Sequence, residues 1–295
     1  MILFSIIIPH KNIPNLLQRC LDSIPRRNDI QIIIVDDNSD ESIVDFSNFP
    51  GQNRHGVEVF FKKEGKGAGY ARNIGLKYAK GQWLLFADAD DFFNPCFEQM
   101  LNKYADSKYD LIYFGITSVK SSTLEPANRG LEINNYITNA IKGDIESQDY
   151  VRYKFLYPSA KMIQRIYCEK NNIHYDEIPA SNDTMFGVKV ASFTNNIAYD
   201  PHCIYCLTLR ENSLVTSYLK VNLESRFYTS FRLYKFLKKI GKEQYAQSPI
   251  MHCFQFRHIS YVLCLEKYIE TFAHYPLVRI IKETYMIIYK KHVNH

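Results

Sequence analysis

The feature of this sequence that most constrains its fold is the alternation of apolar runs with amphipathic segments in the first part of the chain. Continuous runs rich in Ile, Val, Leu and Phe, typical of strands covered on both faces, lie at residues 3–9, 31–37, 57–62, 82–88 and 110–116. Helical patterns lie between them, at residues 13–24, 67–81 and 95–106. Strands joined by helices run parallel, so the sequence predicts an α/β protein with a parallel sheet flanked by helices.

The remaining sequence has weaker patterns. It predicts loops over 117–150, helices over 160–172 and 182–192, a strand over 197–210, and helices from about residue 220 onward. We therefore expect a sheet-containing domain at residues 1–215. A helical C-terminal extension at residues 216–295 is expected to pack on that domain.

Composition excludes several classes of protein. The 46% apolar and 23% charged residues are typical of a soluble globular chain, and no run of about 18 apolar residues predicts a membrane-spanning helix. Seven scattered cysteines indicate free thiols in a reducing cytoplasm, and the pair Cys203 and Cys206 lacks a second pair for a zinc site. The N-terminal apolar run is expected to be a strand rather than a signal peptide. Lys and Arg are dispersed, so nucleic-acid binding is not expected.

Acidic residues gather where two predicted strands end. Asp36 and Asp37 follow one strand, and Asp88, Asp90 and Asp91 follow another. In parallel sheets, ligands bind at the carboxyl ends of the strands. Three acids within four positions repel one another unless something positive lies there, and Mg²⁺ or Mn²⁺ accepts such oxygen ligands together with substrate phosphates. The alternative is a solvated turn in which Asp residues cap a loop or helix.

Two further segments favour a nucleotide ligand. Asp36 or Asp37 can accept a hydrogen bond from a ring N–H of a base such as uracil, although capping of the following turn is an alternative role. The segment GKGAGYARNIG at 65–75 contains Gly67, where backbone can approach a ligand, and Arg72, a fork for phosphate. A plain turn before a core helix is the alternative, because the spacing matches neither the dinucleotide nor the phosphate-loop motif.

Five segments, in order, resemble the family-2 glycosyltransferases of the GT-A fold: FSIIIPHKN, IIIVDDNSDE, GKGAGYARNIGLKYAKG, WLLFADADDFF and SNDTMF. The resemblance covers about residues 3–215. It implies a Rossmann-like GT-A domain with a mixed, mostly parallel sheet flanked by helices. It also implies a nucleotide-diphosphate sugar as donor (a UDP-sugar is expected), a divalent cation and inversion at the anomeric carbon.

The resemblance also implies roles for individual residues. Binding of the donor nucleotide is expected from Pro9, Lys11, Asn12, Asp36, Asp37, Gly67, Arg72 and Asp88. Asp90, with Asp88, is expected to hold Mn²⁺ or Mg²⁺, and Asp183 is expected to be the general base. Arg210 and Ser213 are expected to close over the donor phosphates. Asn182, where the family commonly has an acid, and His10 in the first loop depart from the family pattern.

The expected reaction moves a sugar to a hydroxyl of a glycan or lipid-linked acceptor in surface polysaccharide synthesis. Two alternatives stay open, a non-catalytic nucleotide-sugar-binding protein on the same fold and an α/β phosphohydrolase that uses an Asp nucleophile. His202 is a candidate further metal ligand, with packing as its alternative role.

The end of the chain mixes apolar positions at helical spacing, such as Leu277, Ile281 and Tyr285, with Lys and Arg. This pattern fits a helix packed on the first domain. It also fits a basic amphipathic helix that contacts the inner face of the cell membrane. We therefore expect a cytoplasmic protein, with peripheral membrane contact as the second interpretation of this segment.

Overall fold

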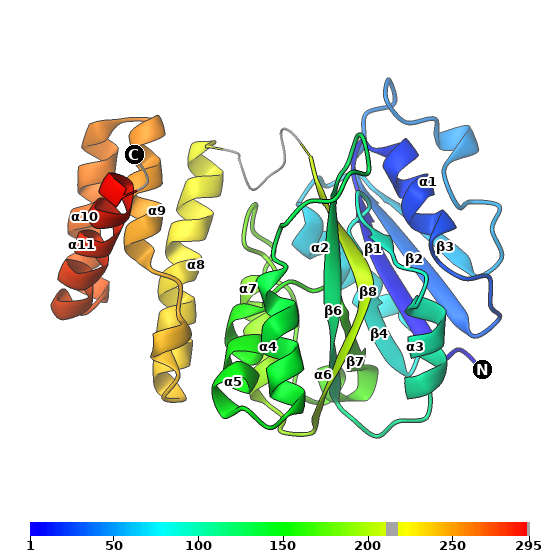
Figure 1. Cartoon of the computed structure of the whole chain (residues 1–295). Helices are drawn as coiled ribbons and strands as arrows, with labels where there is room; N and C mark the ends of the chain where they lie inside the picture. Colours follow the sequence, from blue (N-terminus) through cyan, green and yellow to red (C-terminus); the bar gives the residue numbers. More distant parts are fainter. Residues whose placement is uncertain (211–217, 294–295) are drawn as a thin grey trace. The chain divides into compact units, whose positions relative to one another are not determined.

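The computed structural model describes residues 1–210 and 218–293 and confirms the predicted α/β class (Figure 1). The strands are β1 Phe4–His10, β2 Ile30–Asp37, β3 Val57–Lys62, β4 Trp83–Phe86, β5 Phe92–Phe93, β6 Leu111–Lys120, β7 Lys161–Gln164 and β8 Ile197–Leu209. The α-helices are α1 Pro14–Asp22, α2 Ala68–Tyr78, α3 Phe97–Tyr104, α4 Glu132–Ile141, α5 Ile145–Lys154, α6 Arg165–Lys170, α7 Thr184–Ser192, α8 Lys220–Lys239, α9 Pro249–Gln255, α10 Tyr261–His274 and α11 Leu277–Val293. Short 3-10 turns are η1 Phe46–Asn48, η3 Glu243–Tyr245 and η4 Phe256–His258.

The strands form one eight-stranded sheet in the order β3-β2-β1-β4-β7-β6-β8-β5. β1 runs parallel to both β2 and β4, and the pairs β2–β3 and β6–β8 are also parallel. β7 runs antiparallel to β4 and β6, and β5 runs antiparallel to β8. The sheet is therefore mixed and mostly parallel, as predicted. Its parallel half places the carboxyl ends of β1, β2 and β4 at one edge.

The central strands are buried on both faces, which is why their sequences are continuous apolar runs. β2 is buried along its whole length, and α1 covers the sheet with Leu17 and Leu21. α2 approaches β1 so closely that a Cβ at Gly75 would lie 2.3 Å from Cγ2 of Ile7. This contact fixes α2 against the sheet, with the first turn of the helix at the carboxyl end of the strands.

The middle of the chain is more regular than predicted. β6 continues to Lys120, and the expected loops over 117–150 contain the paired helices α4 and α5, whose Tyr136 and Tyr150 rings stack 3.6 Å apart. The helix expected over 160–172 begins as strand β7 and becomes helical only in α6. A short apolar run can form a strand or a helix. Here it forms a strand because it pairs with β4 on one side and with β6 on the other.

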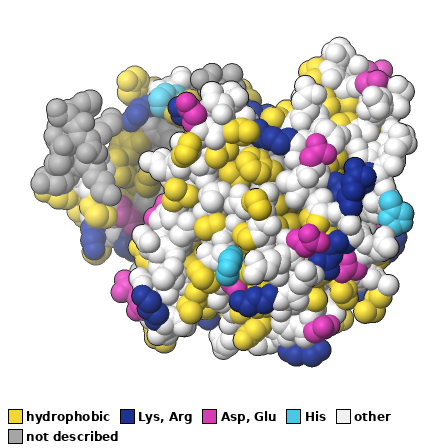
Figure 2. Space-filling model, turned by 45° about the vertical axis from the view of Figure 1, so that its right-hand side comes forward, with side chains coloured by type: hydrophobic (Ala, Val, Ile, Leu, Met, Phe, Trp, Pro, Cys, Tyr) yellow, Lys and Arg dark blue, Asp and Glu magenta, His cyan; other side chains and the backbone are white. Residues whose placement is uncertain are grey.

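The chain forms two compact units. One comprises Met1–Glu177 with Phe186–Glu211, and the other comprises Ile178–Met185 with Asn212–His295. The second unit is helical, and the boundary predicted between residues 215 and 216 stays a prediction. Within the described part of the chain, every helix is too short or too polar to cross a bilayer. On the face shown in Figure 2, basic and acidic side chains lie beside one another and apolar side chains are scattered among them, an ordinary protein surface.

Candidate active site

Both predicted acid clusters lie at one edge of the sheet. In the register of the parallel strands, His10 of β1 pairs with Asp36 of β2, and Ile7 of β1 pairs with Phe86 of β4. β1 separates β2 from β4, so the ends of these two strands are roughly 10 Å apart at the usual strand spacing. Asp36 and Asp37 therefore face the same edge as the acids that follow β4.

The start of α2, from its N-cap Gly67 to Arg72, bonds to both clusters. The backbone N–H of Gly67 donates to Oδ2 of Asp37 at 2.7 Å, and Gly67 has a φ of 92°, which favours glycine. Arg72 lies in the same helix and donates from Nη2 to Oδ1 of Asp88 at 2.5 Å. The guanidinium of Arg72 is buried and lies 5.3 Å from the centre of the Tyr175 ring. The protein itself therefore supplies part of the positive charge that the acids after β4 require.

The turn that carries the acids after β4 is fixed through its backbone. The N–H of Asp88 donates to the hydroxyl of Tyr205 at 2.8 Å. The carbonyl of Asp90 accepts hydrogen bonds from Nη2 of Arg19 at 2.6 Å and from Oγ1 of Thr208 at 2.9 Å. These donors come from α1 and β8, so the turn is positioned by elements far away in the sequence. Hydrogen bonds from the protein itself thus hold the conformation of the turn.

The three carboxylates of this turn have different surroundings. Oδ1 of Asp91 accepts the backbone N–H of Thr208 at 2.7 Å, and burial together with the charges of Asp88 and Asp90 raises the pKa of Asp91 well above its usual value. Burial, followed by the charge of Asp88, also raises the pKa of Asp90. Nε of Arg210 lies 3.8 Å from Oδ2 of Asp90 and opposes that rise. Asp91 thus supports β8, and Asp88 and Asp90 are the more exposed pair.

Asp36 is held by protein groups. Its carboxylate accepts hydrogen bonds from Nδ1 of His10 at 2.7 Å and from the N–H and hydroxyl of Ser39 at 3.0 and 2.5 Å. Nε2 of His10 accepts the N–H of Ile13 at 3.2 Å, which fixes the proton on Nδ1. Burial alone would raise the pKa of Asp36, but the bonds from His10 and Ser39 outweigh it and lower the pKa. The histidine that departs from the family pattern is thus the partner of this acid.

The first loop lies beside this pair. Asn12 has a φ of 58°, donates its N–H to the Ser39 hydroxyl at 2.8 Å, and accepts the N–H of Asp40 through Oδ1 at 2.7 Å. Lys11 is exposed and Pro9 is half-buried. The structure therefore brings the first loop, the end of β2, the start of α2 and the acids after β4 to one edge, while their roles toward a ligand stay predictions.

The contacts described above do not test two of the predicted residues. Asp183 is half-buried and directly precedes α7, in the segment Ile178–Met185 of the second unit. Its role as general base stays a prediction. Ser213 lies outside the described residues, whereas its proposed partner Arg210 lies beside Asp90.

Several residues that support the site were not predicted. Arg19, Tyr205 and Thr208 reach the acid turn from distant parts of the sequence, and no local pattern marks them. Asn73 is different, because it follows Arg72 directly. Nδ2 of Asn73 donates to the carbonyl of Tyr175 at 3.0 Å, and its Oδ1 accepts the N–H of Tyr175 at 2.9 Å. The A-R-N segment contains a polar residue beside the predicted ligand-binding Arg72, so a contact of Asn73 with another part of the chain could have been expected.

His202 does not join the acid cluster. Its Nδ1 lies 2.7 Å from Oδ1 of Asp200, and it precedes Thr208 by six residues of β8, which is roughly 20 Å along a strand. Among the described residues, no group of three or more His, Cys, Asp or Glu side chains is arranged to hold a metal ion. The acids after β4 can therefore supply at most part of a coordination shell.

Asp200 contributes to stability in a way that depends on pH. Burial would raise its pKa, but hydrogen bonds from Lys103, from the N–H and ring of His202, and from Tyr104 lower it to about 2. Because the folded pKa lies below the unfolded one, this stabilisation is present above pH ~4 and is lost as pH falls through about 2.

We expect Asp200→Asn to lower the free energy of unfolding at pH 7 by about 2–3 kcal/mol. The difference in the free energy of unfolding between the variant and the parent, measured by urea denaturation, should be constant from pH 7 down to about 4. Below pH ~4 this difference should become smaller. The exposed Asp106, changed to Asn, is the control and should leave stability unchanged. A pH-independent difference would contradict the assigned pKa.

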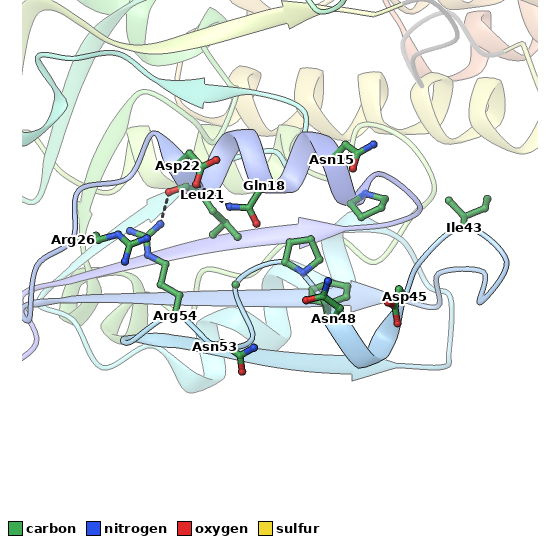
Figure 3. A pocket seen from close by; sticks show the side chains of 14 residues that line it. Asn15, Gln18, Leu21, Asp22, Arg26, Ile43, Asp45, Asn48, Asn53 and Arg54 are labelled. Atoms are coloured by element: carbon green, nitrogen blue, oxygen red, sulfur yellow. Dashed lines mark hydrogen bonds between the residues drawn. The ribbon is translucent and has the colours of Figure 1, made fainter.

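A cavity of about 540 Å³ lies on another side of α1 (Figure 3). It is bounded by α1 and by the segment that contains η1, and none of the predicted site residues lines it. Its Arg54 donates to the carbonyls of Leu21, Ile24 and Pro25 at the end of α1. That arginine closes the helix terminus, so we assign this cavity no part in the site.

Comparison with known proteins identifies the family. The model of "Glycosyl transferase family 2" matches residues 5–170, more than half of the chain. The chain belongs to glycosyl transferase family 2. The predicted resemblance is thereby confirmed, and the matched residues include the first loop, the acids after β2 and β4 and the start of α2.

Curated relatives of this family-2 chain are longer than the regions that match. It is 24% identical over 216 residues to "Uncharacterized glycosyltransferase EpsJ" of Bacillus subtilis, a match that covers 72% of this chain and 62% of that protein. It is 37% identical over 109 residues to the "Poly(ribitol-phosphate) beta-glucosyltransferase" of Bacillus spizizenii, covering 35% of this chain and 17% of that protein. The chain thus spans less than two thirds of these relatives.

Solved structures agree on the fold. The structure of S. aureus TarS 1-349 in complex with UDP-GlcNAc superposes with a TM-score of 0.63 at 20% identity, covering 88% of this chain and 73% of that one. The predicted GT-A fold is therefore confirmed for this family-2 chain.

Proposed function

We propose that this chain is an inverting glycosyltransferase that moves a sugar from a UDP-sugar to a hydroxyl of a glycan or lipid-linked acceptor in surface polysaccharide synthesis. Membership of family 2 supports the reaction class. The complex of TarS with UDP-GlcNAc supports the donor class, and the poly(ribitol-phosphate) enzyme among the relatives supports a cell-surface acceptor. A cytoplasmic location belongs to the same proposal.

The observation that carries the proposal is the pair of bonds that the start of α2 makes to both acid clusters. Gly67 bonds to Asp37 after β2, and Arg72 bonds to Asp88 after β4. A nucleotide diphosphate that lies along this edge meets carboxylates for its base and ribose, and a buried guanidinium and a helix N-terminus for its phosphates. Pro9, Lys11 and Asn12 would border the base, and Arg210 the phosphates.

A divalent cation fits the acids after β4. Burial and the charge of Asp88 disfavour the ionised form of Asp90, and a cation held by Asp90 and Asp88 would relieve that repulsion. Mg²⁺ and Mn²⁺ commonly take one or two carboxylates and complete their shell with substrate phosphates and water, which suits a site with two available acids. When bound, the ion would neutralise charge on the leaving diphosphate.

The remaining step is the attack of the acceptor hydroxyl on the donor sugar. In this proposal Asp183 takes the proton from the acceptor hydroxyl as that oxygen bonds to C1 of the sugar. The bond from C1 to the diphosphate oxygen breaks on the opposite face, and the anomeric configuration inverts. Asn182 provides no second carboxylate beside this base.

Donor hydrolysis with a panel of nucleotide sugars, with and without Mn²⁺, tests the proposed function. We expect one UDP-sugar to raise the melting temperature of the protein and to be hydrolysed slowly to UDP in a Mn²⁺-dependent reaction. Binding without turnover in the presence of acceptor extracts would favour the non-catalytic alternative. Release of inorganic phosphate from phosphomonoesters would favour the phosphohydrolase.

A further inference from the structure

Two helices of the second unit carry exposed apolar stripes. On α10 the stripe comprises five side chains that are between 48% and 81% exposed, namely Tyr261, Val262, Leu265, Ile269 and Phe272. On α11 it comprises four that are between 56% and 78% exposed, namely Leu277, Val278, Ile281 and Tyr285. At 3.6 residues per turn, each set falls within an arc of roughly 100°. Each helix therefore has one continuous apolar face in solvent.

The opposite faces of both helices make the contacts within the unit. Thr271 of α10 is fully buried, and its Oγ1 lies 3.2 Å from Sγ of Cys253 in α9. Glu283 of α11 is buried, accepts a hydrogen bond from the Tyr275 hydroxyl at 2.7 Å, and bonds to Ser248 at the start of α9. An ordinary surface helix buries its apolar side and exposes its polar side. α10 and α11 pack through mixed, polar contacts and leave the apolar side uncovered.

The same part of the chain is strongly basic. Residues 212–295 contain 13 Lys and Arg against 5 Asp and Glu, a net charge of +8. Residues 1–211 contain 23 against 26, a net charge of −3. The net positive charge of the protein thus lies in residues 212–295, the part of the chain that contains α10 and α11.

We propose that the exposed faces of α10 and α11 form a docking surface for an anionic lipid bilayer. Apolar side chains of a helix that lies in the plane of the interface enter the boundary between headgroups and acyl chains, and the net positive charge of residues 212–295 attracts anionic headgroups. A second copy of this chain would bring another segment with a net charge of +8 close to the first, which disfavours self-association. The surface is independent of the proposed sugar transfer.

Vesicle cosedimentation of the whole chain tests this proposal. We compare vesicles of phosphatidylcholine alone with vesicles that also contain phosphatidylglycerol, at low and high salt. The test variant is Ile269→Asn/Ile281→Asn, whose side chains are 60% and 62% exposed in the parent. The control is Ile145→Asn/Ile166→Asn in the first unit, where the parent side chains are 69% and 62% exposed.

We expect binding to phosphatidylglycerol vesicles that weakens with salt, a fall of at least roughly tenfold in the partition coefficient of the test variant, and no change in the control. Three outcomes would overturn the proposal: no binding of the parent at low salt, equal binding to both kinds of vesicle, or equal losses in the test and control variants. A parent that sediments as a dimer and becomes monomeric in the test variant would overturn it too, since the faces would then belong to a second copy.

Discussion

Asp183→Asn is expected to lower turnover by roughly 10²–10⁴-fold, the usual contribution of a general base, while donor affinity stays unchanged. The amide keeps the size and hydrogen-bonding reach of the side chain but cannot accept the acceptor's proton. Turnover should be measured with saturating donor, and donor affinity by titration of the same protein preparation. A fall in donor affinity of the same size would assign Asp183 to the donor site.

The control for this variant is Glu177→Gln, an exposed acid in the segment that leads to Asp183. It removes one negative charge six residues before Asp183, so a general electrostatic effect would appear in both variants. We expect the turnover of Glu177→Gln to equal that of the parent. Near-normal turnover of Asp183→Asn would exclude this residue as the base.

Asp90→Asn is expected to remove the Mn²⁺-dependent part of donor affinity. Loss of a group that only supports a metal ligand costs about 10–100-fold in metal affinity, and loss of one of two carboxylate ligands should cost at least as much. The burial that raises the pKa of Asp90 means that the folded protein should tolerate the neutral amide. Donor titrations at several Mn²⁺ concentrations measure the effect.

The neighbouring Asp91 offers a matched control. Asp91→Asn makes the same chemical change one residue away, but Oδ1 of Asp91 accepts the N–H of Thr208, a role that an amide oxygen can keep. We expect Asp91→Asn to retain the Mn²⁺ dependence of the parent. If both variants lost the Mn²⁺ dependence of donor affinity equally, the effect would reflect the total charge of the turn. Asp90 would then not be identified as a metal ligand.

The strands of the parallel half could be predicted because their signal is local. A strand buried on both faces needs an unbroken apolar run, and the segments that became β1, β2 and β4 are such runs. The acids that follow them could be assigned to one edge because parallel strands share the direction of their carboxyl ends. The α4–α5 pair could not be found this way, since its buried side chains are spread among many polar ones.

The sequence by itself determined the α/β class, the order of the motifs and the placement of the acids after β2 and β4, because periodicity and strand ends are properties of neighbouring residues. Only the tertiary structure decided which groups meet those acids. Tyr205 and Thr208 reach the turn after β4 across more than a hundred residues, and His10 reaches Asp36 across the gap between two strands. Such partners are selected by packing in three dimensions, and residues this far apart leave no common pattern in the sequence.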